Sequence, residues 1–530
     1  MSESLSMVVQ KPSRGLKQTV EHLLARNGWP LMFVTGVAIT LLSVAHISVV
    51  AAAWGVFGFP FDDAWIHLQY ARTIFEGYPW EYAQGIPSTG SSAPLWSVLL
   101  APIFVLGCAR DMVITSVLFI SVLLYAIDTF LVGYLVREHT GQWLVGVLGQ
   151  AVFVLVPRNA GLMLSGMETP LAMMMLLLTL IMLPRKDTKY DLLLGLVAGL
   201  AYLSRPEFVL IAAVCLPLRA IWLLAKDRLA IGRLVSIGGM FAIAALVVAP
   251  WVLHCLNTTG LPLPDSYYSK LRWGVTQTDI SYWDFFWYQV WFPAEPYLAL
   301  GFVGGMILLL KRRPFELVMG TSLFILYRMT MPGMSLLFAA RYLVPLFDLL
   351  AISFVAGGFV ALEKLLNRVK IPGFTATDRA FVASIVVLLL FTPSLSSYIL
   401  HVDIHANQIM NINQMQVTLS EWVRDNVPED AVIATYDVGA LGYFSRCTVI
   451  DVYGLVTPEV LHNRTTVPEQ AQFLKDIHCD YIMFYEEWFW YFWNEISHIG
   501  GSVHKVVSAH IEPNVVCGTS NMAVYAVTWS

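Results

Sequence analysis

The chain has 530 residues, of which 57% are hydrophobic and only 13% are charged, and its formal net charge is −5. A soluble protein carries roughly 25% charged residues, so this composition excludes a soluble globular protein. The small net charge argues against a nucleic-acid partner. The mean hydropathy of +0.65 and several apolar runs long enough to cross a bilayer predict a polytopic α-helical membrane protein.

The N-terminal segment is basic and then becomes apolar. Its basic residues are Lys11, Arg14, Lys17 and Arg26, and the apolar run extends from Trp29 to Phe57. This run is longer than the apolar region of a secretory signal, so we expect it to remain as the first span. Because positive residues favour the cytoplasmic side of a span, we predict that residues 1–28 form a cytoplasmic tail.

Residues 29–400 are predicted to form a transmembrane module. After the first span, apolar runs lie near residues 112–136, 143–157, 167–184, 191–204, 206–224, 234–256, 295–310, 314–331, 341–362 and 380–399. Arg205-Pro206 separates two of these runs, which we expect to form short helices that meet at an outer turn. A single kinked helix is the alternative.

The run 93–108 decides the topology. If it spans, the basic clusters at 185–189 and 311–313 lie outside; if it is a short helix in the outer interface, they lie inside. The second choice satisfies the positive-inside rule and predicts about 11 spans. It makes 58–111 a first outer loop with interfacial helices, and 257–294 a second outer loop.

The composition changes at residue 401. The segment 401–530 has no run long enough to span, and strand-like stretches at 431–435, 448–452 and 480–484 alternate with helix-like stretches. This alternation predicts a small α/β domain. Because the number of predicted spans is odd and the N-terminus is predicted to be cytoplasmic, we expect this domain on the extracytoplasmic side of a multi-pass protein of the cell membrane. The aromatic stretch Trp488–Trp493 is typical of a membrane interface.

Two adjacent carboxylates, Asp62 and Asp63, follow the first span closely in FDDAWIHLQYAR. If a helix begins here, either residue is a good cap, and Asp63, His67 and Tyr70 share one helical face. A capped amphipathic helix on the membrane surface is one interpretation. The other is a general base whose neighbouring carboxylate raises its pKa or binds a cation. A metal site at Asp63 and His67 lacks a third ligand nearby.

Basic residues recur in apolar surroundings at the predicted outer boundary. They are Arg205 in SRPE, Lys270 in YYSKLR and Arg341 in AARYLVP. Charges in such places are usually paired or functional. Each one alone could be a snorkelling anchor, but together they favour the binding of an anion such as a lipid phosphate. Glu168 and Glu207 could pair with these cations or hold sugar hydroxyls.

Six stretches in this order resemble the membrane-embedded glycosyltransferases of the GT-C class. They are FDDAWIHLQYAR…STGSSAPLW, SGMETPL, GLAYLSRPE, LPLPDSYYSKL, RYLVPL and ATYDVGALGYFS…VIDVYGLVTPE. The likeness covers about residues 55 to 460 and is strongest to the branch that contains the mycobacterial terminal arabinofuranosyltransferase. Protein mannosyltransferases and the lipid A aminoarabinose transferase are more distant relatives.

The resemblance implies an inverting transfer of a sugar from a polyprenyl-phosphate donor to an outer-face acceptor. The catalytic acid of the class lies in the first outer loop, which matches Asp62 or Asp63 here. It would deprotonate an acceptor hydroxyl, and cations would stabilise the leaving phosphate. These cations would be Lys270, Arg341 and Arg205. Lys270 matches the lysine of a PNTFYAK-like stretch of the family, although Asp265 replaces an amide there.

The C-terminal domain is expected to cap the site. Asp437 and Asp451 directly follow expected strands, the end at which α/β sheets place ligand sites, and could hold an acceptor or form simple turns. Further candidates for sugar or acceptor contact are His67, Glu168, Glu207 and Tyr267. The acceptor could be a glycan, a lipid or a protein.

The sequence leaves cofactors and other function classes open. No cofactor is certain, and a divalent cation remains an option; the six cysteines have no metal-like spacing. A transporter of lipid-linked or small polar substrates is one alternative, although transporters place their polar residues near the bilayer midplane. A non-catalytic glycan-binding membrane protein is the other.

Overall fold

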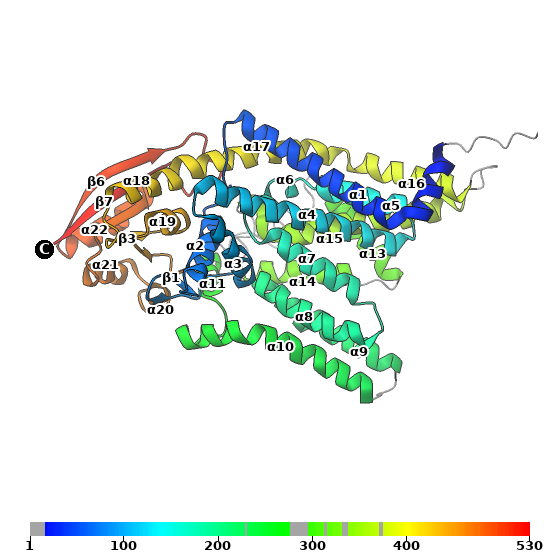
Figure 1. The fold of residues 1–530 in the computed structure, drawn as a ribbon, viewed down its shortest axis with the longest axis horizontal. Helices are drawn as coiled ribbons and strands as arrows, with labels where there is room; N and C mark the ends of the chain where they lie inside the picture. Colours follow the sequence, from blue (N-terminus) through cyan, green and yellow to red (C-terminus); the bar gives the residue numbers. More distant parts are fainter. Residues whose placement is uncertain (1–15, 228–230, 276–294, 312–314, 331–337, 370–374) are drawn as a thin grey trace, which may run out of the picture.

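The computed structural model describes residues 16–227, 231–275, 295–311, 315–330, 338–369 and 375–530. Figure 1 shows a bundle of helices at one end of an elongated molecule and an α/β domain at the other. Residues 1–15 of the predicted tail, 276–294 of the predicted second outer loop, and 312–313 of a basic cluster lie outside the described residues.

The bundle contains the apolar runs seen in the sequence. Its helices are α1 (Leu16–Ala53), α4 (Arg110–Thr140), α5 (Trp143–Val154), α6 (Asn159–Leu162), α7 (Thr169–Met182), α8 (Thr188–Ser204), α9 (Leu216–Asp227), α10 (Ile231–Thr259), α13 (Tyr297–Leu310), α14 (Phe315–Thr330), α15 (Val344–Leu366), α16 (Ala376–Phe391) and α17 (Pro393–Ile412). By length and composition, five of the described helices could cross a membrane, or six if one bent pair counts as a single span. The span number of about 11 therefore stays a prediction.

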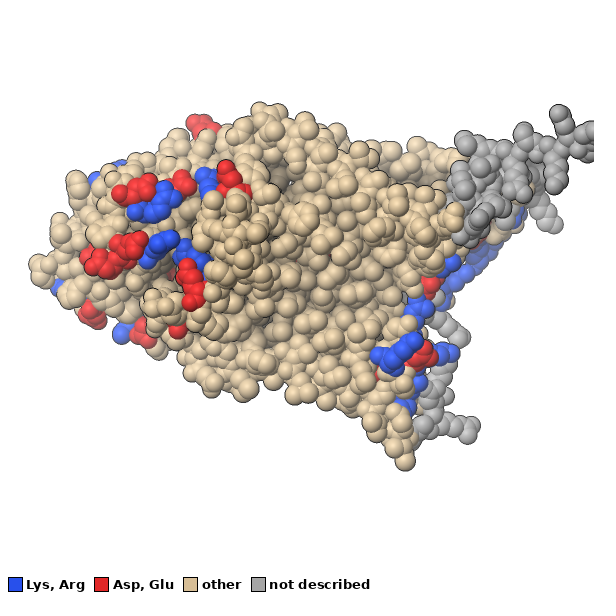
Figure 2. Space-filling view, in the orientation of Figure 1, with Lys and Arg blue, Asp and Glu red and all other residues tan. Residues whose placement is uncertain are grey.

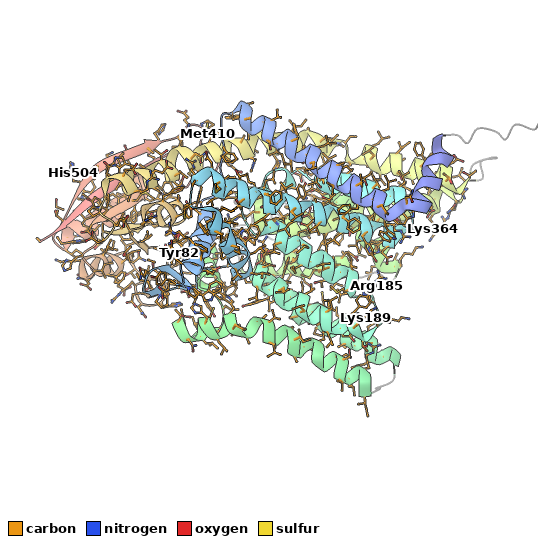
Figure 3. All side chains as sticks on the ribbon, viewed as in Figure 1. Tyr82, Arg185, Lys189, Lys364, Met410 and His504 are labelled. Carbon is orange, nitrogen blue, oxygen red and sulfur yellow. The ribbon has the colours of Figure 1, made fainter. Side chains whose placement is uncertain are left out.

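The charged residues visible on one face of the molecule lie at its two ends (Figure 2). Figure 2 shows a broad band without visible charged residues between the two charged ends. Arg185, Lys189 and Lys364 lie at the end opposite to the α/β domain (Figure 3). Residues 93–108 form only the short helix α3 (Pro94–Leu100) and the 3-10 helix η1 (Ala101–Leu106), as the preferred topology requires.

The run 191–224 forms two helices, as we predicted from the Arg205-Pro206 break. Arg205 has an extended backbone (φ −155°, ψ 125°) because the ring of Pro206 disfavours a helical conformation in the preceding residue. The 3-10 helix η2 (Pro206–Phe208) and the π-helix η3 (Ile211–Cys215) follow. Arg219 of α9 donates from Nε to Asp191 of α8 over 2.9 Å, so the chain turns back on itself here.

Residues 58–111, predicted to form the first outer loop, pack against the C-terminal domain. They contain α2 (Asp63–Phe75), β1 (Glu81–Ala83) and β2 (Ile86–Pro87). All residues of α2 from Ala64 to Ala71 are buried, whereas the sequence suggested a surface helix with one exposed face. The reason is the helix α19 (Gly439–Ser445), which packs against α2; the ring centroids of Trp65 and Tyr443 are 5.0 Å apart.

The C-terminal domain is an α/β domain, as predicted. Its sheet has the order β4-β3-β5-β7-β6, in which β3 is parallel to β4 and β5, while β7 is antiparallel to β5 and β6. The strands are β3 (Val432–Thr435), β4 (Thr448–Asp451), β5 (Tyr481–Tyr485), β6 (Gly501–His510) and β7 (Asn521–Trp529). The helices are α18 (Thr418–Asn426), α19, α20 (Pro458–Asn463), α21 (Val467–Asp476) and α22 (Glu486–His498).

The bundle and the domain are continuous. The predicted boundary at residue 401 falls inside α17, which continues through the π-helix η6 (Asn413–Val417) into α18. Side chains of the first outer loop also bond to the domain: Tyr82 donates to the carbonyl of Val438 over 2.7 Å, and Tyr82 lies at this junction in Figure 3.

Candidate active site

A cavity of about 630 Å³ lies between the C-terminal domain and the end of the bundle that faces this domain. Predicted site residues that line it are Asp62, Asp63, His67, Glu168, Arg205, Lys270, Arg341 and Asp437. The side chains of Glu207, Tyr267 and Asp451 are not among the lining residues. The fold therefore brings together residues from the first outer loop, the bundle and the domain, which are far apart in sequence.

Asp62 is bonded to the C-terminal domain. Its side chain makes no capping bond to α2; instead, its two carboxylate oxygens accept the backbone N–H groups of Gly439 at 2.6 Å and Ala440 at 2.8 Å. Burial and the nearby Asp437 carboxylate raise the pKa of Asp62 to about 8, against the lowering effect of the two amides. Asp62 thus titrates close to the pH range in which a general base works best.

Asp63 is an ion-pair partner. It pairs with the guanidinium of Arg341. Although burial acts in the opposite direction, the positive charges of Arg341 and Lys270 hold the pKa of Asp63 below its usual value. The two neighbouring carboxylates therefore have different environments: Asp63 is paired with a cation that lowers its pKa, while Asp62 is held by backbone amides and has a raised pKa.

The cationic part of the cavity lies around Tyr342. Arg341, in the 3-10 helix η5 (Phe338–Leu343), donates to the hydroxyl of Tyr342 over 3.0 Å. Lys270 of α11 (Asp265–Val275) places its Nζ 5.2 Å from the centre of the Tyr342 ring. Within the described part of the chain, this ammonium has no hydrogen bond and no ion pair within 4 Å. An anion could therefore take up the three donors of Lys270.

A second charged group lines another wall. The Nε2 atom of His67 lies 3.3 Å from a carboxylate oxygen of Glu168, and Nε of Arg205 lies 3.7 Å from the other oxygen. Although burial opposes it, these two contacts hold the pKa of Glu168 at about 2. Arg205 also bonds Glu207 at 2.7 Å. Glu207 thus orients Arg205 from behind the cavity wall.

Asp437 is the acidic group that the C-terminal domain contributes. Its Oδ2 atom accepts from Nε2 of Gln416 over 2.8 Å and from the hydroxyl of Tyr485. Burial raises the pKa of Asp437 more than these two bonds lower it. Among the described residues no hydrogen bond reaches its Oδ1, and Asp437 lines the cavity, so Oδ1 is available to a substrate hydroxyl.

Asp451 shapes a loop. Its oxygens accept the backbone N–H groups of Tyr453, Leu455 and Val456, at 2.7, 2.5 and 2.9 Å. Burial raises the pKa of Asp451 to about 7 although the amides act in the opposite direction. Tyr453 and Leu455 of this loop line the cavity. Asp451 thus shapes the cavity indirectly, by fixing the loop whose residues line it.

Two residues of α11 also turn away from the cavity. Tyr267 packs edge-on against Tyr268, with ring centroids 5.4 Å apart. Nε2 of His462 lies 2.8 Å from Oδ1 of Asp265, and this contact ties α11 to α20. Asp265 therefore contacts the C-terminal domain and is not among the residues that line the cavity.

The sequence did not single out several lining residues. They are Tyr342, Gln416, Tyr436, Tyr485 and the loop 514–518. Trp488 also lines the cavity, although the sequence indicated only that it belongs to an aromatic stretch. Tyr342 follows Arg341 and could have been noticed for that reason. The others have no local motif, because they line the cavity only through the packing of the C-terminal domain.

Metal ligation is not evident at this site. Searching the part of the chain that the structure describes, no group of three or more His, Cys, Asp or Glu side chains is arranged to hold a metal ion. Asp62, Asp63 and Asp437 all line the cavity, but each of them already has an amide or guanidinium partner. The sequence analysis left a divalent cation open as an option, and the described residues do not decide it.

Comparisons with known proteins relate the fold to solved structures. Residues 407–525 match the model of a domain of unknown function (DUF8728). No curated protein matches the chain. The chain is similar to ArnT from Cupriavidus metallidurans bound to undecaprenyl phosphate, with 11% identity and a TM-score of 0.55, over 92% of this chain and 97% of that one.

A second similarity is to the oligosaccharyltransferase of Archaeoglobus fulgidus. Its structure tethered with an acceptor peptide that contains the NVT sequon is 13% identical, with a TM-score of 0.55, over 96% of this chain and 75% of that one. Its complex with Zn and sulfate is 14% identical, with a TM-score of 0.50, over 84% of this chain and 68% of that one.

These similarities define the class of the fold. The chain is a polytopic membrane protein with the GT-C fold and a C-terminal α/β domain. At such low identities the likeness concerns the fold alone. The more specific resemblance, to the arabinofuranosyltransferase branch, stays a prediction from the sequence.

Proposed function

We propose that this protein is a membrane glycosyltransferase that moves a sugar from a polyprenyl-phosphate donor to an acceptor hydroxyl on the outer face of the cell membrane. The observation that carries the proposal is the cavity, in which buried cations and carboxylates from three parts of the chain face one another. The fold adds support, since one solved protein with a similar fold was crystallised with undecaprenyl phosphate.

The donor phosphate would bind at Lys270 and Arg341. The ammonium of Lys270 has no hydrogen-bond partner among the described residues, and Arg341 is oriented by its pairing with Asp63. Arg205 lines the same cavity and would reach the phosphate or the sugar. The lipid chain of the donor would lie among the apolar helices, because exposing its hydrocarbon to water is unfavourable.

The chemical step is a displacement at the anomeric carbon. Asp62 would accept the proton of the acceptor hydroxyl as the new carbon–oxygen bond forms. The bond between the anomeric carbon and the phosphate oxygen breaks, and the phosphate leaves with the electron pair, stabilised by the cations. Asp62 suits this role better than Asp63, because Asp63 is neutralised by its pairing with Arg341.

The acceptor would enter from the side of the C-terminal domain. Asp437 offers Oδ1 to a hydroxyl, and the Tyr485 and Trp488 rings line the same side. His67 and Glu168 also line the cavity and would contact the sugar. On this proposal the C-terminal domain lies outside the cytoplasm and residues 1–28 lie inside it.

The proposal is tested by incubating the purified full-length protein with a panel of polyprenyl-phosphate sugars and measuring sugar release. We expect release from at least one donor, and its loss in Asp62→Asn. A protein that binds these donors without releasing sugar from any of them would instead be a transporter or a binding protein.

A further inference from the structure

The outer face of α22 carries a group of large exposed aromatic side chains. The exposed fractions are 40% for Trp488, 51% for Trp490, 57% for Tyr491 and 54% for Trp493. The opposite face of α22 packs Phe489, Phe492 and Ile496 into the domain core. Exposed aromatic groups of this size usually mark an interaction site.

This aromatic surface, Trp488–Trp493, begins at the cavity and leads away from the membrane. Trp488 lines the cavity, as does Tyr485 just before the helix. From Trp488 to Trp493 the helix rises ~7.5 Å. The helix ends near Gly500, whose carbonyl accepts the backbone N–H of Ser530, and the C-terminus lies at the end opposite to the bundle (Figure 1). The aromatic stretch therefore extends toward the end of the domain that lies away from the bundle (Figure 1).

The chemistry of the surface indicates its ligand. The α22 sequence EEWFWYFWNEISH contains acidic residues but no Lys or Arg, which disfavours anionic lipids and nucleic acids. Two rings are already ordered, since Trp490 and Tyr491 stack with centroids 3.6 Å apart. Flat apolar rings with a polar N–H or O–H edge fit a neutral sugar, which has a C–H face and a rim of hydroxyls.

We infer that the aromatic surface binds a neutral acceptor glycan of several units, whose terminal sugar reaches into the cavity. Trp488 connects the two parts, because it belongs both to the cavity wall and to the aromatic surface. The inference rests on the proposed function and narrows its acceptor to an extended oligosaccharide rather than a lipid or a protein. Sugar units beyond the terminal one would then add affinity without taking part in the reaction.

The test measures binding without turnover. Linear neutral gluco-, manno- and arabino-oligosaccharides of increasing length are titrated into the full-length protein in nanodiscs by calorimetry. In the wild-type protein, at least one series should bind about tenfold or more tightly on going from one unit to six, which is the size of effect expected of buried aromatic contacts. The double variant Trp490→Ala/Trp493→Ala should lose that gain while monosaccharide affinity stays unchanged.

The control is Trp54→Ala, a tryptophan at the end of α1 with 42% exposure; its length dependence should match the wild type. Affinity that is independent of length in all series, or a gain that survives in the double variant, would overturn the inference. Binding to phosphatidylcholine–phosphatidylglycerol vesicles that the double variant alone loses, with sugar binding intact, would assign the rings to a membrane. This titration measures binding and requires no sugar transfer. A failure of the proposed function would therefore appear in the sugar-release assay and not in this titration.

Discussion

The carboxylate of Asp62 accepts the backbone N–H of Gly439, a residue 377 positions further along the chain. A Cβ atom at Gly439 would lie 2.0 Å from the backbone oxygen of Asp62, so the close approach of the two segments requires glycine at this place. The proposed general base is therefore held by the C-terminal domain, and its geometry depends on the docking of that domain.

The first prediction concerns this contact. Gly439→Ala should lower both the thermal stability and the rate of sugar transfer, because α19 must move away from Asp62 and leave its carboxylate without two amide donors. Gly238→Ala is the control, since its Cβ would have no neighbour within 4 Å and alanine favours a helix by roughly 1 kcal/mol. Thermal unfolding and turnover are measured together. A Gly439→Ala protein with wild-type turnover would contradict the role of this contact.

The second prediction concerns the base itself. Asp62→Asn should reduce turnover by ~10²–10⁴-fold, the usual value of general-base catalysis, while undecaprenyl phosphate still binds. Asn can accept only one of the two amide bonds, so some loss of stability is expected as well. Asp63→Asn should reduce turnover less than Asp62→Asn does. It should mainly weaken the binding of the donor, because Arg341 loses its ion-pair partner. Equal, wild-type rates in both variants would show that these carboxylates are structural.

The third prediction concerns pH. Because burial and Asp437 raise the pKa of Asp62 to about 8, a base that acts as the carboxylate should give a kcat/KM that rises with pH up to about that value. Asp437→Asn removes the negative neighbour, lowers the pKa of Asp62 and should move this rise to lower pH. The pH profiles of the two proteins are compared with one donor. If the midpoint of the pH profile does not move, Asp437 does not influence the proton transfer.

The fourth prediction concerns the donor phosphate. Lys270→Ala should weaken the binding of undecaprenyl phosphate by about ten- to a hundredfold, since a hydrogen bond to a charged group contributes ~1.5–3 kcal/mol. Lys189→Ala, at the other end of the molecule in Figure 3, should bind as the wild type does. If a folded Lys270→Ala protein binds undecaprenyl phosphate with unchanged affinity, Lys270 does not bind the phosphate.

The fifth prediction concerns topology. In a background in which the exposed Cys108 is replaced by serine, a membrane-impermeant thiol reagent should label Gln84→Cys and Lys505→Cys from outside intact cells. Lys189→Cys should be labelled only after the cells are opened. The reason is that Lys189 lies at the end of the bundle opposite to the C-terminal domain. Labelling of Lys189→Cys in intact cells would reverse the orientation.

The sequence alone determined the class of the protein, a polytopic membrane protein with a C-terminal α/β domain, whereas the outer position of its polar residues stays a prediction. With few charges and many long apolar runs, no soluble fold could bury this chain, and the positive clusters decided between two topologies. The strands β3, β4 and β5 could also be read locally, because each is a short apolar run bounded by turns. By contrast, β6 alternates between half-buried and exposed residues and, with β7, was not recognised.

Only the tertiary structure separated the roles of the acidic residues. Asp62 and Asp63 are neighbours in sequence, but successive residues at the start of a helix point in different directions, so Asp63 meets Arg341 and Asp62 meets Gly439. Likewise Asp437 and Asp451 both follow strands, yet the loop after Asp451 folds back to donate its amides to that residue alone. Such partners are set by long-range packing, which no local pattern in the sequence records.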